Sequence, residues 1–380
     1  MVDPESDAPP TTIHESKETE AGDELAEATS CLHVDVLTSP LLQAARSSRT
    51  FSEDMPETNI SFPRYRDLIG DTPLVDITSL CNPKAKNVRV LGKAEFLNPG
   101  FSMKDRIVKS MLDGAEARGE LVPGKDCTVV AASSGNTGAS VAMQCAMRGY
   151  DAVILTNKKC SQEKCDAIRA YGAELRIVEQ GVCYMQEETR LALLNPTWFS
   201  LNQYDNPDNP KAHYGSTGPE IWRDTGGRVT HFVAAGSTGG TVSGTGRYLK
   251  EQNPAVKVVM SDPIGSIFFN YHKTGQLDAP GKFLVEGVGK NNIPGAMDFG
   301  VVDDMIQVSD KDAFKMCKTL ARTEGICCGG STGLNVCAAI QLANETDQDN
   351  AVIVTILCDL GVKYLSKVYN DQWLESNKMM

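Results

Sequence analysis

The sequence predicts an α/β fold in which helices cover both faces of parallel sheets. From about residue 62 onward, short runs of β-branched residues alternate with amphipathic stretches, and glycine marks the junctions. Strands that alternate with helices are typical of parallel sheets, because each connection crosses a face of the sheet.

Seven strands are expected in this part of the chain. They span residues 88–93, 128–132, 152–156, 175–178, 231–235, 257–261 and 352–357. Between them, apolar residues recur with helical spacing, which predicts helices that each bury one stripe. The stripes consist of Ile107, Met111 and Ala115; of Val141, Cys145 and Met147; and of Ala313, Met316, Cys317 and Leu320.

The first 60 residues have a different composition from the rest. They hold 13 acidic and 3 basic side chains and are rich in Ser, Thr and Pro. Their few apolar groups cannot offset the entropy of ordering, so residues 1–60 are expected to be a disordered acidic tail. Cys31 and His33 could ligate a metal or haem, but such a pair in a polar segment is usually only part of the tail.

The charge of the chain argues against several classes of partner. The chain carries 37 basic and 49 acidic side chains, a net charge of −12, of which the tail contributes −10. The nearly neutral remainder offers no basic surface for nucleic acid or anionic lipid, and no apolar run is long enough to span a membrane. Nine acids and one lysine among the first 30 residues are unlike a transit peptide, so a cytoplasmic location is expected.

The 12 cysteines are expected to be reduced thiols of the core. Most of them lie inside apolar runs, and no secretory signal precedes them. The pairs Cys160/Cys165 and Cys327/Cys328 lack the spacing of a zinc site, so no metal site is expected.

One loop places a lysine at the start of a helix. Ser102 is followed three residues later by Asp105, which resembles a capping box and predicts a helix beginning near Met103. Lys104 would then lie in the first turn, where the helix dipole and Arg106 both disfavour an ammonium ion. Such an amine suits a nucleophile, although from position alone a solvated surface lysine is the simpler interpretation.

Three further loops join a strand to a helix. In Ser134-Gly-Asn-Thr-Gly138, before a helix expected from Ala139, amides can hold a carboxylate or phosphate, or can only cap the helix. Ser237-Thr-Gly-Gly-Thr241, before a helical segment at Arg247, resembles a phosphate cradle, with nucleotide binding as a weaker alternative because no Walker or Gly-x-Gly-x-x-Gly pattern is present. Ser331 is expected to cap the helix after the last loop.

In this order, the loops resemble the pyridoxal-phosphate (PLP) enzymes of fold type II, in the cysteine synthase and cystathionine β-synthase family. The resemblance runs from Tyr65 to Trp373. It rests on Gly70-Asp-Thr-Pro-Leu74, Ser102-Met-Lys-Asp-Arg106, Ser134-Gly-Asn-Thr-Gly138, Ser237-Thr-Gly-Gly-Thr241, Glu286-Gly-Val-Gly289 and Gly329-Gly-Ser-Thr-Gly333. It implies a tryptophan synthase β-like fold of two open, twisted, mostly parallel sheets, with residues 61–376 forming two interleaved α/β subdomains, the smaller at about 98–200.

The resemblance also implies the cofactor, PLP, and the residues of the site. Lys104 would form the Schiff base and act as catalytic base, Asn136 would contact the ring hydroxyl, and Ser331 would contact the pyridine nitrogen. The phosphate would lie against Ser237, Thr238, Gly239, Gly240 and Thr241. The substrate would be bound by Ser134, Gly135, Thr137, Gly138, Gln203 and Gly287.

The implied reaction is replacement of the β-substituent of serine, or of an activated serine, by a thiol or sulfide through an aminoacrylate. A neutral hydroxyl at the pyridine nitrogen weakens the electron sink, which favours elimination at Cβ over transamination. Residues 262–266, 271–275 and 364–373 look more like cystathionine β-synthases, which use serine and homocysteine. Cysteine synthase, using O-acetylserine and sulfide, and a noncatalytic partner-binding regulator are the alternatives.

Three residues depart from the family pattern and leave the second substrate open. Phe101 replaces a usual glycine beside the lysine and is expected to narrow the pocket or alter substrate choice. Ser237 also replaces a glycine, and Lys290 stands where the synthase often has a tyrosine or an acid. A homodimer is expected from the resemblance. The chain has no room for the C-terminal regulatory pair of many cystathionine β-synthases, so activation by adenosylmethionine is not expected.

Overall fold

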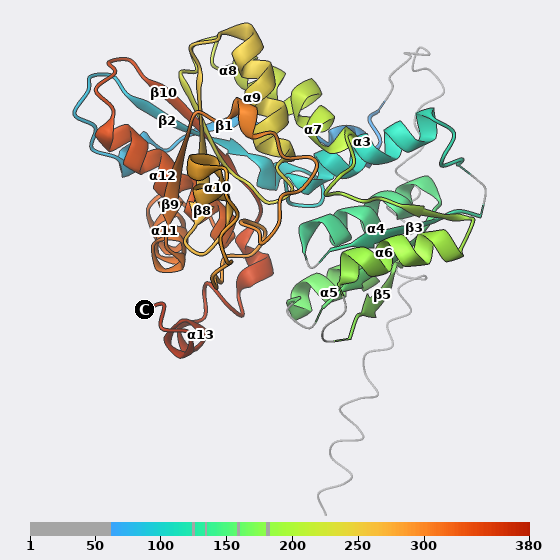
Figure 1. The fold of residues 1–380 in the computed structure, drawn as a ribbon. Helices are drawn as coiled ribbons and strands as arrows, with labels where there is room; N and C mark the ends of the chain where they lie inside the picture. Colours follow the sequence, from blue (N-terminus) through green and yellow to red (C-terminus); the bar gives the residue numbers. More distant parts are fainter. Residues whose placement is uncertain (1–61, 124–125, 134, 158–159, 180–182) are drawn as a thin grey trace, which may run out of the picture. The chain divides into compact units, whose positions relative to one another are not determined.

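The computed structural model describes residues 62–123, 126–133, 135–157, 160–179 and 183–380. The predicted acidic tail, with Cys31 and His33, and the predicted substrate residue Ser134 lie outside these residues. Residues Pro63–Met380 form one compact unit. It contains two sheets with helices on their faces, which confirms the α/β prediction (Figure 1). None of the helices in the described ranges is long and apolar enough to cross a membrane.

The larger sheet has six strands in the order β1-β2-β10-β7-β8-β9. All neighbouring strands run parallel except β1, which is antiparallel to β2. The strands are β1 (Leu74–Asp76), β2 (Arg89–Ala94), β7 (His231–Ala235), β8 (Lys257–Pro263), β9 (Asp304–Val308) and β10 (Val352–Leu357).

Side chains alternate between the two faces of this sheet. Ile353 and Leu357 of β10 pack with α11 (Asp310–Thr323) and α12 (Gly330–Glu345). Val354 and Ile356 point to the opposite face, which packs with α8 (Gly218–Asp224) and α9 (Gly240–Gln252). Because both faces are buried, β10 reads as a nearly continuous apolar run, as expected of a central parallel strand.

The smaller sheet has four parallel strands in the order β5-β4-β3-β6. The strands are β3 (Thr128–Ala132), β4 (Asp151–Thr156), β5 (Glu174–Ile177) and β6 (Trp198–Ser200). One face packs with α3 (Lys104–Ala117), α4 (Asn136–Arg148) and α5 (Gln162–Ala170). The other face packs with α6 (Tyr184–Leu194).

The predicted strands are confirmed, with ends that shift by one or two residues. Three strands were not predicted: β1 and β6, which have only three residues each, and the edge strand β9. The remaining α-helices are α7 (Asp208–Ala212), α10 (Phe268–Thr274) and α13 (Asp371–Ser376), and a π-helical turn, η4 (His213–Thr217), joins α7 to α8.

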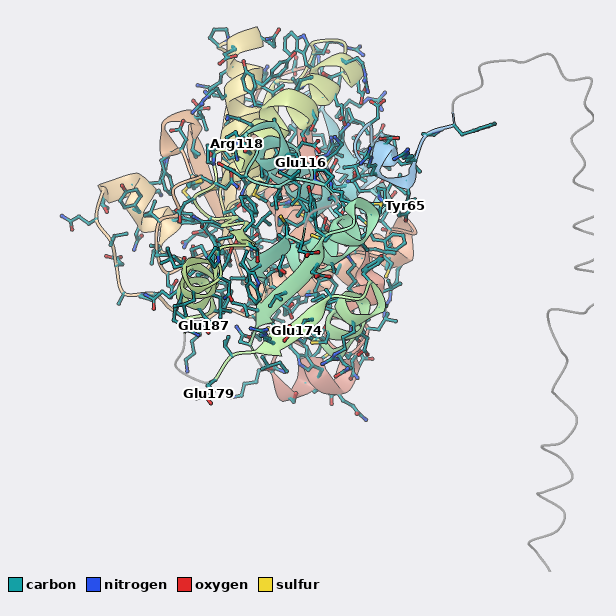
Figure 2. All side chains as sticks on the ribbon, turned by 90° about the vertical axis from the view of Figure 1, so that its right-hand side faces the viewer. Tyr65, Glu116, Arg118, Glu174, Glu179 and Glu187 are labelled. Carbon is teal, nitrogen blue, oxygen red and sulfur yellow. The ribbon has the colours of Figure 1, made fainter. Side chains whose placement is uncertain are left out.

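Figure 2 shows the side of the molecule that carries β5 and the exposed residues of α6. Glu174 on β5 pairs with Arg176, and Glu187 on α6 pairs with Arg190, each at 2.6 Å. These acids are therefore matched by arginines from the same element, and such exposed pairs contribute little to stability.

Candidate active site

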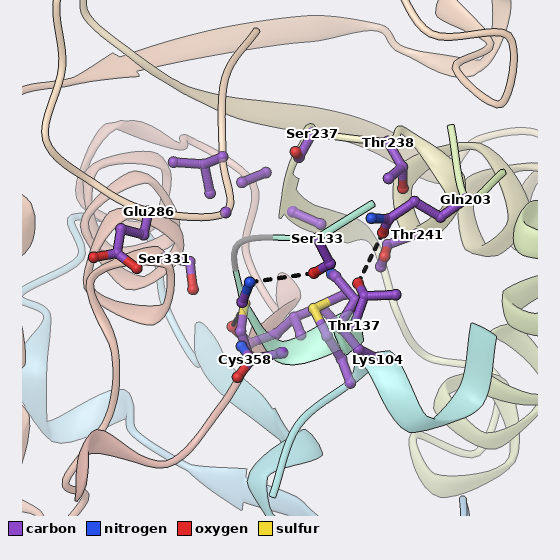
Figure 3. Close-up of a pocket in the computed structure, with 18 of the residues that line it drawn as sticks. Lys104, Ser133, Thr137, Gln203, Ser237, Thr238, Thr241, Glu286, Ser331 and Cys358 are labelled. Carbon is purple, nitrogen blue, oxygen red and sulfur yellow. Dashed lines mark hydrogen bonds between the residues drawn. The ribbon is translucent and has the colours of Figure 1, made fainter. Parts of the chain in front are cut away.

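A cavity lies where several parallel strands of the two sheets end (Figure 3). Its walls come from the segments that follow β3, β7 and β10, and from the first turns of α3, α4 and α12. Loops at the carboxyl ends of parallel strands are the usual position of ligand sites in α/β folds. This arrangement brings the four loops singled out in the sequence into one place.

Lys104 is the first residue of α3, and its side chain reaches the cavity. Burial lowers the pKa of Lys104, against the opposing effects of Cys358, Asp359 and Glu95. The expectation that Arg106 repels the ammonium is wrong, because its guanidinium is held between Glu95 and Glu220 at 2.7 Å from each. The amine is therefore reactive because it is desolvated.

The predicted capping box is not formed at the start of α3. The N-cap residue is Met103, which has no side-chain cap. Ser102 Oγ accepts a bond from the Lys104 N–H at 3.3 Å, and the Asp105 carboxylate accepts one from the Gly100 N–H at 2.5 Å. Asp105 thus closes the turn before the helix, while the helix begins close to the predicted position.

The segment after β3 supplies part of the cavity wall. Ser133 Oγ accepts bonds from the N–H groups of Gly135 at 3.2 Å and Gly138 at 3.0 Å, and the Thr137 hydroxyl donates to Gln203 Oε1 at 2.8 Å. Gly135, Thr137 and Gln203 line the cavity together with Gly287.

Gly138 does not line the cavity. A Cβ at this position would lie 2.8 Å from Ile154 Cγ2, so the glycine allows α4 to approach β4 closely. Helix α4 begins at Asn136, which is three residues earlier than expected.

Asn136 lines the cavity, and its amide already has two partners. Its Nδ2 donates to Asp359 Oδ2 at 2.7 Å, and its Oδ1 accepts from Lys363 Nζ at 3.0 Å. The Tyr364 hydroxyl donates to the same Asp359 oxygen at 2.6 Å. The resemblance gives Asn136 a role at the ring hydroxyl of PLP, and this network fixes the orientation from which it would act.

The loop after β7 has the form of an anion cradle. Ser237, Thr238, Gly239 and Thr241 line the cavity at the start of α9, which begins at Gly240 rather than near Arg247. Gly239 has a φ of 86°, and a Cβ there would lie 2.5 Å from the Met297 Cα, so only glycine fits. Hydroxyls and amides at the N-terminus of a helix of 13 residues suit a phosphate.

Gly240 lies behind the cradle. A Cβ at this position would come within 1.9 Å of Asn209 Oδ1. The residue therefore allows α7 to pack against the start of α9, and it does not line the cavity.

Ser331 reaches the cavity from the first turn of α12. It is not the helix cap that the sequence predicted, because Gly329 occupies the N-cap position. Cys358, which directly follows β10, lies beside it, and burial raises the pKa of that thiol to about 12, partly offset by a hydrogen bond from Ser331. A neutral thiol thus lies beside the Ser331 hydroxyl.

Sequence reasoning missed a charged cluster on the cavity wall. Lys164 Nζ on α5 pairs with Glu286 Oε2 at 2.5 Å and lies 4.3 Å from the centre of the Tyr364 ring. Lys367 pairs with the other oxygen of Glu286. We refer to Lys164, Glu286 and Lys367 as the lysine cluster. No sequence signal marks Lys164, whereas Cys358 could have been found from its place after a buried strand.

The structure shows where two residues that depart from the family pattern, Phe101 and Lys290, lie relative to the cavity. Phe101 does not line the cavity: its side chain is 47% exposed, and its φ of 59° is one that glycine adopts more easily. The expectation that it narrows the pocket is therefore not met. Lys290 Nζ lies 3.9 Å from the centre of the Tyr204 ring, and burial lowers its pKa to about 8. Tyr204 itself lines the cavity.

The donor set fits PLP. The cavity combines a desolvated amine at Lys104, an anion cradle at residues 237–241 and a neutral hydroxyl at Ser331. These groups match the aldehyde, the phosphate and the pyridine nitrogen of this cofactor.

Comparisons with known proteins agree with this geometry. A family model described as pyridoxal-phosphate dependent enzyme matches residues 65–359. Cystathionine beta-synthase of Apis mellifera is 35% identical over 343 residues, which cover 88% of this chain and 67% of that protein. Cysteine synthase B of Pseudomonas aeruginosa is 39% identical over 310 residues, covering 81% of this chain and 97% of that protein.

Solved structures give the same result. The O-acetylserine dependent cystathionine beta-synthase from Helicobacter pylori superposes with a TM-score of 0.75 at 31% identity, covering 82% of this chain and all of the other. The chain spans 55% of the mouse cystathionine beta-synthase, to which it is 36% identical.

Proposed function

We propose that this chain condenses serine, or an activated serine, with homocysteine to form cystathionine. The chain belongs to the pyridoxal-phosphate dependent enzymes, and within them to the cystathionine β-synthase and cysteine synthase type. The sulfur of homocysteine forms a bond to Cβ of the donor, and the β-substituent leaves with the proton of the thiol. The observation that carries the choice of homocysteine is the lysine cluster.

The lysine cluster brings ammonium groups to the wall of the cavity. Two ammonium groups face the single carboxylate of Glu286, which keeps its charge because Lys164 and Lys367 hold its pKa below the usual range although burial raises it. Lys164 Nζ and Glu286 both line the cavity. The buried ammonium of Lys164 on this wall favours a ligand with a carboxylate, which homocysteine has and sulfide lacks.

The donor amino acid has a separate position in this proposal. Its carboxylate would bind at the N-terminus of α4, beside Gly135 and Thr137, with Gln203 behind them. Lys104 would hold the cofactor covalently and, once released, would take the proton from Cα of the donor. Bound at this site, PLP supplies the electron sink for the charge that develops at Cα.

Ser331 limits the strength of that electron sink. A neutral hydroxyl cannot stabilise a full positive charge on the pyridine nitrogen as a carboxylate would. The neutral Ser331 hydroxyl, with the neutral Cys358 thiol beside it, therefore favours loss of the β-substituent over transamination.

The second candidate is cysteine synthesis from O-acetylserine and sulfide, which the 39% identity to cysteine synthase B favours. A product screen by mass spectrometry separates the two candidates. Serine and O-acetylserine are each paired with homocysteine and with sulfide, and cystathionine is expected to form fastest. Cysteine as the dominant product with negligible cystathionine would refute the proposal.

A variant of Lys164 tests the observation itself. In Lys164→Met, the KM for homocysteine should rise roughly tenfold or more, because a contact to a charged group is lost. The KM for 3-mercaptopropylamine, which is homocysteine without its carboxylate, should not change. Lys109→Met is the control, since Lys109 is exposed and pairs with Asp113 outside the cavity. Equal losses with both thiols would contradict the assignment.

We further propose a homodimer in a reducing, cytoplasmic setting. All 11 cysteines in the described part of the chain are free thiols, which is typical of that compartment. The support for a dimer is a group of exposed apolar side chains, Tyr65, Leu97, Phe101 and Val362.

A further inference from the structure

Both threonines of the anion cradle are contacted from behind by a buried side chain. Asn209 Nδ2 lies 3.0 Å from Thr238 Oγ1, and His213 Nε2 lies 3.2 Å from Thr241 Oγ1. A threonine hydroxyl has one proton to donate. If the group behind the hydroxyl donates a hydrogen bond to it, the hydroxyl proton is free for a ligand in the cavity. If that group accepts instead, the hydroxyl proton points to it and cannot bond to the ligand.

The orientation of Asn209 follows from a third atom. Its Nδ2 also lies 2.7 Å from the backbone carbonyl oxygen of Gln203. Because a carbonyl oxygen only accepts, the group that faces it must be the NH₂ of the amide. Thr238 therefore accepts a hydrogen bond from behind, and its own proton is available to an anion.

The same reasoning determines which ring nitrogen of His213 carries the proton. Nδ1 lies 2.9 Å from Thr217 Oγ1, and Thr217 is buried with no other side-chain partner among the residues that the structure describes. A buried hydroxyl that donates to nothing is costly, so Thr217 donates and Nδ1 accepts. In a neutral ring the proton is then on Nε2, which faces Thr241.

The ring is held neutral by its surroundings. Burial lowers the pKa of His213 to about 3, and the positive charges of Arg106 and Lys104 act in the same direction. Glu95 and Glu220 oppose this effect without cancelling it.

Close packing brings the ring to the cradle. His213 is in the π-helical turn η4, and Gly244 of α9 lies against α7 and η4, where a Cβ would be 2.1 Å from the Pro210 carbonyl oxygen and 3.0 Å from the His213 Cβ. Only glycine lets the two helices approach so closely at this point.

We propose that His213 is a positioning residue for the cofactor phosphate, which as the Nε2–H tautomer donates to Thr241 and so turns the hydroxyl proton of Thr241 toward the phosphate. Asn209 has the same role at Thr238. The cradle is thus built from two hydroxyls that both act as donors toward an anion. This inference concerns the PLP site and does not depend on which sulfur compound is the acceptor.

The tautomer can be measured directly in the holoenzyme. The chain has only 5 histidines, and ¹⁵N NMR of the histidine-labelled protein distinguishes protonated from unprotonated ring nitrogens. The His213 signals, assigned by their loss in His213→Gln, should show a proton on Nε2 and none on Nδ1. A proton on Nδ1, or on both nitrogens, would overturn the proposal.

A comparison of two cofactors tests the consequence for binding. In His213→Leu, the affinity for PLP should fall roughly ten- to a hundredfold, whereas the affinity for pyridoxal, which lacks the phosphate, should not change. His213→Gln keeps a side-chain N–H and should recover most of the preference for PLP. An equal loss of affinity for both cofactors would show a merely structural role and refute the proposal.

Helix α9 offers a matched control. Thr245 lies one turn beyond Thr241, is fully buried, and has a hydroxyl without a hydrogen-bond partner among the described residues. Thr245→Val should leave the ratio of the two affinities unchanged, whereas Thr241→Val should lower it as His213→Leu does. A change of the ratio in Thr245→Val as large as that in Thr241→Val would count against a specific path through His213.

Discussion

A lysine can act as a nucleophile or a base only when part of its population is uncharged. Lys104 meets this condition because burial lowers its pKa, although Asp359 and Glu95 act against the shift. Arg106, two residues further along the chain, does not add to this shift, since its guanidinium is paired with two carboxylates. At the scale of the residue, desolvation decides the chemistry.

Replacement of Lys104 should abolish both functions that depend on its amine. Lys104→Ala is expected to lose the visible absorption of lysine-bound cofactor and to lower the turnover rate by several orders of magnitude, because one side chain supplies both the covalent anchor and the base. Lys109→Ala, on the exposed side of the same helix, is the control. Retention of the absorption and of borohydride labelling in Lys104→Ala would disprove the assignment.

At the scale of the element, one carboxylate of α6 holds two segments of the site in place. Glu188 is buried and accepts bonds from the N–H groups of Ala132 and Asn202 at 2.7 Å each, and from the Ser200 hydroxyl at 2.8 Å. Ala132 precedes the wall segment at Ser133, and Asn202 precedes Gln203. Helix α6 thus positions the predicted carboxylate site without touching the cavity.

Substitution of Glu188 should therefore affect binding of the donor amino acid. Glu188→Ala removes the acceptor of three hydrogen bonds, and the loss at the buried Ala132 N–H alone should cost about 1–3 kcal/mol in the free energy of unfolding. The KM for the donor should rise more than kcat falls, and Glu188→Gln, which loses fewer bonds, should lie between wild type and Glu188→Ala. Steady-state kinetics test this, with Glu187→Gln as control, because Glu187 is the neighbouring acid and pairs with Arg190 instead. A fall in kcat alone would speak against a positioning role.

The sequence predicted the helices and strands that have a clear hydrophobic periodicity, and the loops that carry reactive or anion-binding residues. The β-branched run that became β10 and the apolar stripe of α3 are where periodicity placed them, whereas the three-residue strands β1 and β6 are too short to show a period. The loop containing Lys104 and the 237–241 loop meet in one cavity. Lys164 and His213 were not predicted as site residues, because their roles depend on packing against elements far away in the chain.

At the scale of the whole molecule, a buried network of charges joins distant parts of the chain. Arg106 contacts Glu95 and Glu220, and Lys93 contacts Glu220 at 2.8 Å. Burial alone would raise the pKa of Glu220, but Arg106 and Lys93 hold it at about 2. The network therefore makes the stability of the fold depend on pH in a defined direction.

The pKa of Glu220 is lower in the folded chain than its ordinary value of 4.5, so its contribution is complete above pH 4.5 and is lost as the pH falls toward 2. Glu220→Gln should lower the urea midpoint at pH 7, because a buried ion pair is broken. Between pH 4.5 and 2.5 the midpoint should fall less steeply than in wild type. Glu174→Gln, which removes an exposed pair, should leave both quantities unchanged, and equal slopes in Glu220→Gln and wild type would contradict the account.

The last feature at this scale is a group of exposed apolar side chains around the loop before α3. Phe101, Leu97, Val362 and Tyr65 are each about half exposed. The segments that carry them are adjacent, because the Tyr65 hydroxyl donates to the Pro99 carbonyl at 2.9 Å and the Leu360 N–H donates to the Phe101 carbonyl at 3.2 Å. Exposed apolar side chains gathered on adjacent segments are typical of an interface, and we expect a second copy of the chain to cover them.

Phe101→Gly tests this interface without weakening the fold of the monomer. The substitution removes the ring from the surface and also relieves a φ of 59°, which costs a residue other than glycine roughly 1 kcal/mol or more. The dissociation constant of the dimer should therefore rise, while the monomer becomes no less stable. Sedimentation velocity over a range of concentrations measures the first effect and urea unfolding the second. Leu193→Ala, at an exposed residue of α6, should leave dimerisation unchanged, and an unaltered dissociation constant in Phe101→Gly would place the interface elsewhere.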